Sequence, residues 1–150
     1  MFLEETKDEE SIKHVMCNTM IFKLANDQDI EPHEYKVDWS SKYLLLQDYE
    51  RIYGLFRIRE FSKITLEAHI YILPEYWGKP VGVKAVKKLE KYARSRGYRN
   101  IFTTVPITCV QVLQFLQKVN CKVCGKIDKG IIFNNELVDV ILFNKNICGV

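Results

Sequence analysis

Residues 64–97 read ITLEAHIYILPEYWGKPVGVKAVKKLEKYARSRG, and they join an alternating segment to a lysine-rich segment through a short turn. In the alternating segment, apolar residues occupy every second position and Glu67, His69 and Tyr71 lie between them, which predicts a half-buried strand. The apolar residues of the last part recur at steps of three and four residues, at Val83, Val86, Leu89 and Ala93. This spacing predicts an amphipathic helix that ends at Gly97.

The passage from this strand into the helix is a candidate anion-binding site. The turn between them contains both glycine and proline, and the helix follows it directly. The first N–H groups of a helix have no partner inside the helix, so they are free to bind a ligand at its N-terminus. A strand, a glycine-bearing turn and a helix N-terminus in this order therefore predict a geometry that can bind an anion.

The chain has 150 residues, and we expect a single domain over residues 1–150. Its apolar, aromatic and charged fractions are ordinary for a soluble globular protein. The sequence contains no apolar run as long as a membrane span, and its first residues, MFLEETKDEESIKH, do not resemble a signal peptide. We therefore expect a cytoplasmic protein. A net charge of +3 is too small to indicate nucleic-acid binding by itself.

Five cysteines are present, at Cys17, Cys109, Cys121, Cys124 and Cys148. An odd number of cysteines without a signal peptide predicts reduced thiols in a reducing compartment. Cys121 and Cys124 form a lone C-x-x-C pair with no second pair at zinc spacing. We interpret them as two ordinary thiols beside a strand, rather than as a metal or redox site, and we predict no metal.

The chain before residue 64 predicts a strand, a helix and two further strands. We expect a short strand at Phe2–Glu5, then one helix that is capped by Thr6 or Asp8, continues to about Ala25 and ends at Asn26–Asp29. The polar connection around Glu31-Pro32-His33 forms a short helix or a loop. Strands at Tyr43–Gln47 and Ile52–Phe61 then form an antiparallel meander with the alternating strand.

The chain after residue 97 predicts a strand, a helix and a hairpin. We expect a strand at Asn100–Val105, which ends at Pro106, and a helix from Cys109 to about Val119 that is capped by Thr108. The helix should turn inward its apolar residues Val110, Leu113, Phe115 and Leu116. The last segment predicts a hairpin of Gly130–Phe133 and Leu137–Phe143 around Asn134-Asn135. The element order is β-α-loop-β-β-β-α-β-α-β-β.

The segment LPEYWGKPVGVKAVKKLEKYA resembles the cofactor-binding segment of the GNAT N-acetyltransferases, especially those that act on protein N-termini. Their pattern here is roughly PEYWGKGYATEAL around a Q/R-x-x-G-x-G/A core. The matching residues are Pro74, Glu75, Tyr76, Trp77, Gly78, Lys79, Gly82 and Ala85. Trp77 stands at the first core position, and Pro80 replaces the central glycine. The element order of the whole chain matches the same fold.

The resemblance implies the fold class: α+β, with a mixed and mostly antiparallel sheet flanked by helices, the GNAT-like acyl-CoA N-acyltransferase fold. It also implies that the alternating strand and Asn100–Val105 run parallel and splay apart, with acyl-CoA between them. The function implied is acetyl-CoA-dependent N-acetyl transfer to an amine of a protein or a small molecule, without a metal. The acceptor would be bound by the variable loops, here Asp27–Ser41 and Gly125–Asn135.

The resemblance assigns the cofactor to the turn. The pyrophosphate would lie over residues 77–82, held by Trp77, Gly78, Lys79, Gly82 and Val83. Pro80 cannot donate an N–H there, and proline is also a common residue in the first turn of a helix. The backbone N–H of Ile72 would polarise the acyl carbonyl. Lys79, Lys84 and Lys87 either attract the phosphates or form an ordinary solvated face.

Acetyl transfer needs a base for the amine and an acid for the leaving thiolate. Glu67 and His69 lie two residues apart on one face of the strand, so Glu67 is the candidate base and His69 the second candidate. Both side chains would also suit a polar outer face of the sheet. With Lys118 aligned on the family's lysine, Leu116 stands where the family often has an acidic tyrosine. Tyr71 and also Tyr76 remain as candidate acids.

Two other functions are consistent with the sequence. The first is a catalytically inactive GNAT-fold protein with a structural or protein-binding role, such as a virion-associated internal protein of a bacteriophage. The terminal segment LQFLQKVNCKVCGKI…IFNNELVDVILF resembles the ends of such proteins. The second is a nucleic-acid binder that uses the basic face of Lys84–Arg99, which we do not expect because no docking motif is present.

Overall fold

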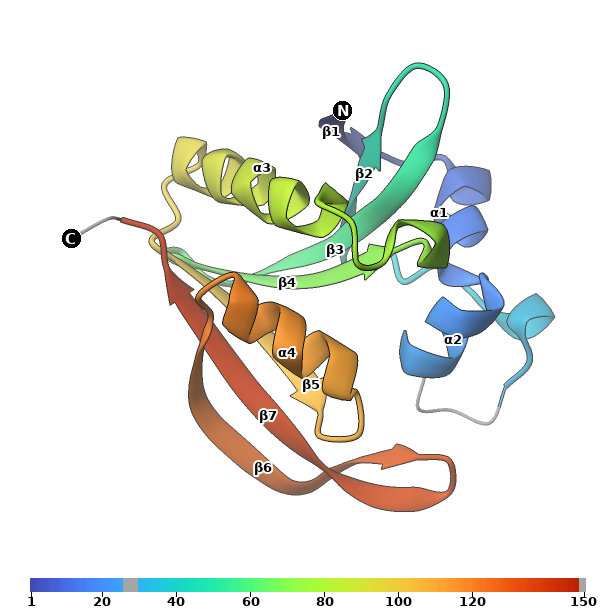
Figure 1. Cartoon of the computed structure of the whole chain (residues 1–150), viewed down its shortest axis with the longest axis vertical. Helices are drawn as coiled ribbons and strands as arrows, with labels where there is room; N and C mark the ends of the chain where they lie inside the picture. The colour runs from blue at the N-terminus through green and yellow to red at the C-terminus, as the bar shows by residue number, and fades with distance from the viewer. Residues whose placement is uncertain (26–29, 149–150) are drawn as a thin grey trace.

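The computed structural model describes residues 1–25 and 30–148 (Figure 1). Its strands are β1 (Phe2–Thr6), β2 (Lys42–Gln47), β3 (Ile52–Ser62), β4 (Thr65–Ile72), β5 (Asn100–Pro106), β6 (Lys122–Phe133) and β7 (Glu136–Asn146). Its helices are α1 (Glu9–Met16), α2 (Thr19–Ala25), α3 (Val81–Ser95) and α4 (Val110–Lys118), with 3-10 turns η1 (Pro32–Glu34) and η2 (Pro74–Tyr76). None of the helices in this described part is long and apolar enough to cross a membrane.

The described strands form one seven-stranded sheet in the order β1-β2-β3-β4-β5-β7-β6. Every neighbouring pair is antiparallel except β4 and β5, which run parallel. The predicted mixed, mostly antiparallel sheet with flanking helices is therefore confirmed. The parallel pair is short, because only Thr65–Glu67 of β4 pairs with Asn100–Phe102 of β5. Beyond these residues the two strands diverge, as Figure 1 shows.

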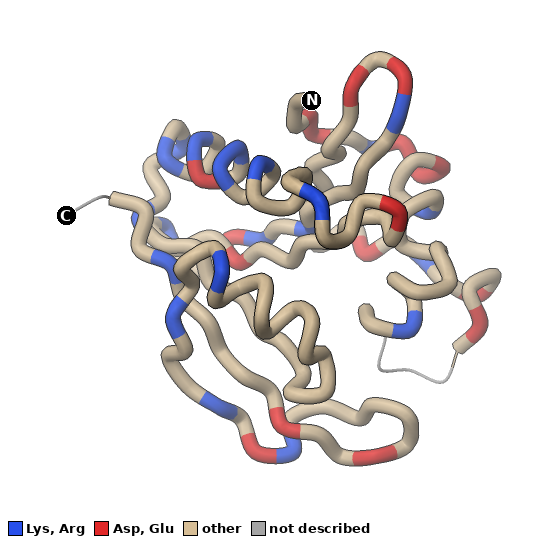
Figure 2. The backbone as a smooth tube through the Cα atoms, in the orientation of Figure 1, with Lys and Arg blue, Asp and Glu red and all other residues tan. Residues whose placement is uncertain are grey.

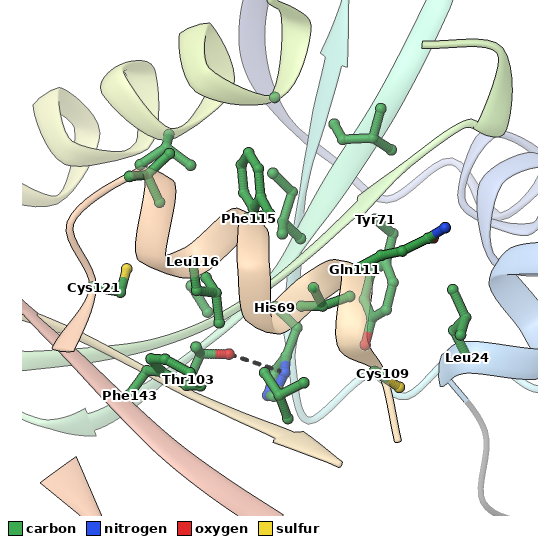
Figure 3. Close-up of a pocket in the computed structure, with 18 of the residues that line it drawn as sticks. Leu24, His69, Tyr71, Thr103, Cys109, Gln111, Phe115, Leu116, Cys121 and Phe143 are labelled. Atoms are coloured by element: carbon green, nitrogen blue, oxygen red, sulfur yellow. Dashed lines mark hydrogen bonds between the residues drawn. The ribbon is translucent and has the colours of Figure 1, made fainter. Parts of the chain in front are cut away.

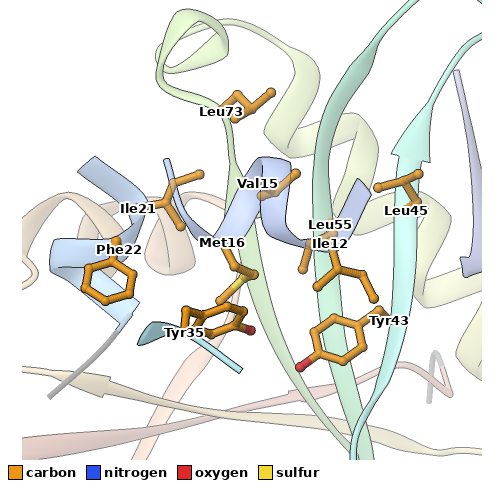
Figure 4. Packing of buried hydrophobic residues seen from close by; sticks show 10 residues of the cluster. All are labelled: Ile12, Val15, Met16, Ile21, Phe22, Tyr35, Tyr43, Leu45, Leu55 and Leu73. Atoms are coloured by element: carbon orange, nitrogen blue, oxygen red, sulfur yellow. The ribbon is translucent and has the colours of Figure 1, made fainter. Parts of the chain in front are cut away.

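Three apolar clusters fill the space between the sheet and its helices. The first lies under α1 and α2 (Figure 4) and contains Ile12, Val15, Met16, Ile21, Phe22, Tyr35, Tyr43, Leu45, Leu55 and Leu73. The second lies under α3 and is built on Leu44, Leu46, Phe56, Ile58, Leu66, Ala68, Ala85, Leu89 and Ala93, with Ile147. The third joins α4 to β5 and β7 through Val105, Cys109, Leu116 and Phe143. Each face of β4 thus has its own core.

The N-terminal helix is divided, so the prediction of one helix up to Ala25 is wrong. α1 ends at Met16 and α2 begins at Thr19. The side chain of Asn18 causes the break, because its Oδ1 accepts hydrogen bonds from the N–H groups of Met20 and Ile21 at 3.1 and 3.4 Å. Asparagine competes for backbone groups in this way and favours a new helix start. The predicted end at Asn26–Asp29 lies outside the described residues.

The C-terminal elements differ from the prediction in detail. Cys109, and not Thr108, is the N-cap residue of α4, and Val110 is 55% exposed because it lies in the first turn on the outer side. The hairpin strands are longer than predicted, because β6 continues through two register shifts and still pairs with β7. The two-residue turn at Asn134-Asn135 is confirmed, with φ values of 52° and 62°. Asparagine tolerates this left-handed conformation.

Gly54 fixes how closely β3 approaches β4 at the end of the alternating strand. A Cβ atom at Gly54 would lie 2.2 Å from the carbonyl oxygen of Tyr71 and 2.9 Å from the Cα atom of Ile72. Both are backbone atoms of β4, so no side-chain rotation relieves the overlap. The glycine therefore holds residues 71–72 in place.

We expect Gly54→Ala to lower the free energy of unfolding by about 1–3 kcal/mol, because β4 must move. Chemical denaturation measures this loss. Gly125→Ala is the matched control, since its Cβ atom would meet only the flexible side chain of Leu142 at 3.2 Å. The control should change stability by less than about 0.5 kcal/mol. Equal losses in the two variants would contradict the role given to Gly54.

Candidate active site

A cavity of about 600 Å³ opens where β4 and β5 diverge. It reaches both faces of β4, because Ile70 and Ile72 of the α3 side and His69 and Tyr71 of the α1–α2 side all line it. Its other walls come from α2, α4, β5 and the turn before α3. This volume is within the range of small-molecule sites. Figure 3 shows the part of the cavity around His69, Tyr71, and α4.

The structure brings most of the predicted site residues to this cavity. Those that line it are His69, Tyr71, Ile72, Trp77, Gly78, Lys79 and Gly82. Glu67 and Val83 are not part of the lining. Glu67 instead lies behind His69, and Val83 contributes its backbone to the first turn of α3.

The backbone of Ile72 faces the cavity side of β4. The N–H of Leu73 donates to the carbonyl of Tyr53 in β3 at 2.9 Å. Because successive residues of a strand direct their polar groups to opposite edges, the N–H and C=O of Ile72 point away from β3. The indole Nε1–H of Trp77 donates to this C=O at 2.7 Å, which ties the turn back onto the strand. The N–H of Ile72 remains on the edge that β5 has left.

The turn and α3 form the predicted strand–turn–helix junction. Gly78 has a φ of +74°, a conformation that side chains rarely adopt. Pro80 is the N-cap residue of α3, one position before the first turn, and the first intrahelical bond runs from the N–H of Lys84 to the carbonyl of Pro80. The N–H groups of Val81, Gly82 and Val83 therefore have no partner within the helix.

Packing against α4 requires a glycine at position 82, and the sequence does not show this. The ring of Phe115 in α4 lies against it, and a Cβ atom at Gly82 would be 2.9 Å from Cε2 of that ring. Phe115 itself lines the cavity and reaches across from α4 to the start of α3 (Figure 3). Farther along, Lys145 of β7 pairs with Glu90 of α3 and donates to the carbonyl of Val119 at 2.6 Å. These contacts join α3 to α4 on one side of the cavity.

Glu67 and His69 form a hydrogen-bonded pair. His69 Nε2 lies 3.0 Å from Glu67 Oε2, and the two side chains are only 16% and 18% exposed. His69 Nδ1 lies 3.4 Å from the hydroxyl of Thr103 in β5 (Figure 3). The bond from His69, with help from Arg59, lowers the pKa of Glu67, so Glu67 is a carboxylate at neutral pH. A carboxylate accepts only, so Nε2 carries the proton of that bond.

Tyr71 and Cys109 lie at the α2 end of the cavity (Figure 3). Burial raises the pKa of Tyr71, so its hydroxyl is protonated at neutral pH. Burial also raises the pKa of Cys109, which keeps this thiol neutral and weakly nucleophilic. Leu116, at the position where the family often has tyrosine, is 6% exposed and lines the cavity.

The other candidate residues show no further site. Lysines follow the outer side of α3 (Figure 2), where Lys84, Lys87 and Lys91 are exposed. All five cysteines are free; Cys121 is half-buried and Cys124 is exposed. Over residues 1–25 and 30–148, no group of three His, Cys, Asp or Glu side chains is placed to hold a metal ion.

Thr103 and Arg57 are among the cavity residues that the sequence did not identify. Thr103 is part of the NIFTTV strand, and Arg57 is part of the strand at residues 52–61. Period-two alternation places Arg57 on the same face as the buried Leu55, and an arginine on a buried face was the available signal. Thr103 carried no comparable signal, because its contact with His69 depends on how β5 diverges.

The sequence matches the Acetyltransferase (GNAT) family over residues 10–119, so the chain belongs to this family. No curated protein matches the sequence.

Solved structures share the fold at low identity. Spermidine N-acetyltransferase from Vibrio cholerae, in complex with CoA and spermine, is 16% identical, with a TM-score of 0.79 over 96% of this chain and 94% of its own. A Salmonella typhimurium structure with its cofactor acetyl-CoA is 12% identical, with a TM-score of 0.75 over 99% and 94%. Ribosomal-protein-alanine N-acetyltransferase from Brucella melitensis is 11% identical, with a TM-score of 0.73 over 97% and 99%. The predicted GNAT-like fold is confirmed.

The pairing of Glu67 predicts a pH dependence of stability. Its pKa is lower in the folded protein than its ordinary value of 4.5, so folding favours the carboxylate. The stability from this pair is then fully present above about pH 4.5 and is lost as the pH falls through the folded pKa. We expect Glu67→Gln to be less stable than the wild type at pH 7, by about 1 kcal/mol, and the difference to shrink towards pH 3.

Denaturant unfolding of both proteins between pH 3 and pH 7 measures this difference. Glu60→Gln is the control, because it removes an exposed carboxylate near the end of β3. It should lower the stability at pH 7 by less than Glu67→Gln does. A difference between wild type and Glu67→Gln that stays constant with pH would contradict the ionised pair.

Proposed function

We propose that the protein transfers the acetyl group of acetyl-CoA to an amine. One observation carries this proposal: a single cavity extends from Gly82, in the first turn of α3, to His69, which is paired with Glu67. The first end suits a phosphate, and the second suits an amine that must lose a proton. The Vibrio cholerae structure contains CoA and the Salmonella typhimurium structure contains acetyl-CoA, which supports the same cofactor here.

The cofactor would lie along the open edge of β4. Its pyrophosphate would face the N–H groups at the N-terminus of α3, next to Gly78 and Lys79, and the helix dipole would favour the negative charge. Pro80 supplies no N–H to this site, so we expect weaker binding than a glycine would give. The N–H of Ile72 would donate to the acyl carbonyl, which becomes negatively charged when an amine attacks it. Acetyl-CoA supplies the acetyl group as a thioester.

The proposed base is His69, supported by Glu67. His69 lines the cavity, whereas Glu67 lies behind it and holds the Nε2 proton. The lone pair of Nδ1, which Thr103 contacts, would take the proton of the acceptor ammonium, and the Glu67 carboxylate would stabilise the resulting imidazolium. The free amine forms the C–N bond as the C–S bond breaks. Tyr71 would protonate the leaving thiolate, and the second proton that the new amide nitrogen releases would restore the Tyr71 hydroxyl.

The alternative is a protein of the same fold that binds a partner without catalysis. The comparisons give no support to it or to a bacteriophage origin, and a location in the cytoplasm stays a prediction. Binding of acetyl-CoA separates the two functions, because a non-catalytic protein has no need to bind acetyl-CoA.

We expect acetyl-CoA to bind with micromolar affinity in isothermal titration. Pro80→Ala adds one N–H donor at the N-terminus of α3 and should lower Kd about tenfold, the effect of one charge-assisted hydrogen bond. Pro74→Ala, in η2, is the matched control and should leave Kd unchanged. Absence of binding at millimolar acetyl-CoA, in wild type and in Pro80→Ala, would refute the enzymatic function.

We expect His69→Ala to lower kcat/KM about 10²–10⁴-fold, because it removes the proposed base. Tyr71→Phe removes only the hydroxyl and should lower kcat about tenfold or more, because it removes the proposed acid. Release of free thiol from acetyl-CoA measures both rates. The Kd of acetyl-CoA should stay within about threefold of the wild type in both variants; full activity in His69→Ala would exclude His69 as the base.

A further inference from the structure

Arg57 lies in the middle of β3 and lines the cavity. The sheet register places it directly opposite His69 of β4 on one side and Tyr43 of β2 on the other. Residues directly opposite each other in a sheet have their side chains on the same face. Tyr43, Arg57 and His69 therefore form a polar row across three strands, and Thr103 extends it to β5 through its contact with His69.

The guanidinium of Arg57 has no carboxylate partner among the described residues. The neighbouring Arg59 pairs with Glu67 at 3.4 Å, whereas Arg57 takes part in none of the described ion pairs or side-chain hydrogen bonds. Its described contact is with the ring of Tyr71, whose centroid lies 6.0 Å away. The carboxylate of Asp38 contributes to the raised pKa of Arg57, and it already accepts hydrogen bonds from Ser40 and Ser41.

Arginine is always charged in proteins, and its partial burial carries a desolvation cost. At Arg57 this cost is offset by nearby tyrosines and by the charge of Asp38, which together raise its pKa. The atoms of this guanidinium still contact solvent, because no side-chain nitrogen of Arg57 is among the fully buried, unpaired atoms of the described residues. Arg57 also lines the cavity, so a ligand that enters the cavity is able to reach these donors.

We propose that Arg57 binds a carboxylate of the acceptor, and that the acceptor is an α-amino acid or a close analogue. This inference rests on the proposed function. Cα atoms of opposite residues in antiparallel strands lie about 4.5–5.5 Å apart. An acceptor that places its amine at His69 and its anion at Arg57 would therefore have the two groups only a few bonds apart. Arginine binds a carboxylate with two parallel hydrogen bonds, which fixes the orientation of the acceptor.

The surroundings of Arg57 favour this class of acceptor over two others. A polyamine such as spermine carries only cations, and Arg57 would repel it. A protein N-terminus has a neutral peptide bond where an amino acid has its carboxylate. The cavity lining includes Ile21 and Leu24 of α2 and Cys109, and Figure 3 shows Leu24 and Cys109 at the same end of the cavity as Tyr71. These apolar groups would surround the side chain of an amino acid.

The test compares α-amino acids with their α-carboxamides, which keep the amine and lose the carboxylate. Free thiol released from acetyl-CoA is followed for each acceptor, with spermine and a peptide N-terminus included. We expect the best amino acid to exceed its amide in kcat/KM by about 30-fold, the effect of one bidentate charged pair. Arg57→Gln should raise KM for the acid about 30-fold and leave the amide unchanged, and Arg57→Lys should keep part of the preference.

The matched control is Arg96→Gln. Arg96 also lies over a tyrosine ring, that of Tyr92 at 3.8 Å, but at the end of α3 away from the cavity. Arg96→Gln should leave the preference for the acid over the amide intact. The thermal stability of Arg57→Gln should equal or exceed that of the wild type. Equal rates with acid and amide, an equal loss of both in Arg57→Gln, or preferred transfer to spermine or the peptide would overturn the proposal while leaving acetyl transfer in place.

A second measurement keeps the two hypotheses separate. N-acetyl amino acids and their amides are titrated into the protein without acetyl-CoA. We expect the acid to bind at least about tenfold more tightly than the amide, and this difference to disappear in Arg57→Gln. Absence of acetyl-CoA binding refutes the proposed function alone. Absence of any preference for the acid in titration refutes the role of Arg57, whether or not acetyl-CoA binds.

Discussion

The short parallel pairing between β4 and β5 is the constraint on which the cavity depends. Three residue pairs, from Thr65–Asn100 to Glu67–Phe102, hold the strands together, and the remaining part of β4 has a free edge. A free edge leaves N–H and C=O groups that need partners. Trp77 satisfies one of them at Ile72, and the rest face the cavity. Because the edge is open, a single ligand would contact both faces of the strand.

The same sheet face serves stability and binding in adjacent rows. In one row, Leu45, Leu55 and Tyr71 lie under α1 and α2 and contribute to the core. In the next row, Arg57 and His69 lie at the cavity and contribute polar groups that a core does not need. A glutamate–histidine pair and an arginine without an ion-pair partner among the described residues depart from an apolar core design, and such departures are expected at functional sites.

The sequence predicts those features that depend on nearby residues. Alternation in residues 65–72 located β4 and placed Glu67 and His69 on one face, and the glycine at 97 marked the end of α3. Features that depend on distant contacts were missed. Nothing near Thr103 indicates that it meets His69, and the ring of Phe115 gives Gly82 a second role that only the meeting of α3 and α4 reveals. The sequence predicts a helix that continues through Asn18, because apolar periodicity extends across this residue. The capping bonds of the Asn18 side chain, which end that helix, leave no mark in the pattern.

The register between β3 and β4 is tied to the chemistry of the site. Side chains alternate along a strand, so a slip of β4 by one residue against β3 would exchange the face of Glu67 and His69 with that of Leu66 and Ala68. The register shift between Glu60 and Ser62, next to the turn, leaves the pairing of Arg57 with His69 intact. The β6–β7 hairpin accommodates two register shifts, and neither of its strands pairs with β3 or β4. Irregularities in this hairpin therefore leave the face of Glu67 and His69 unchanged.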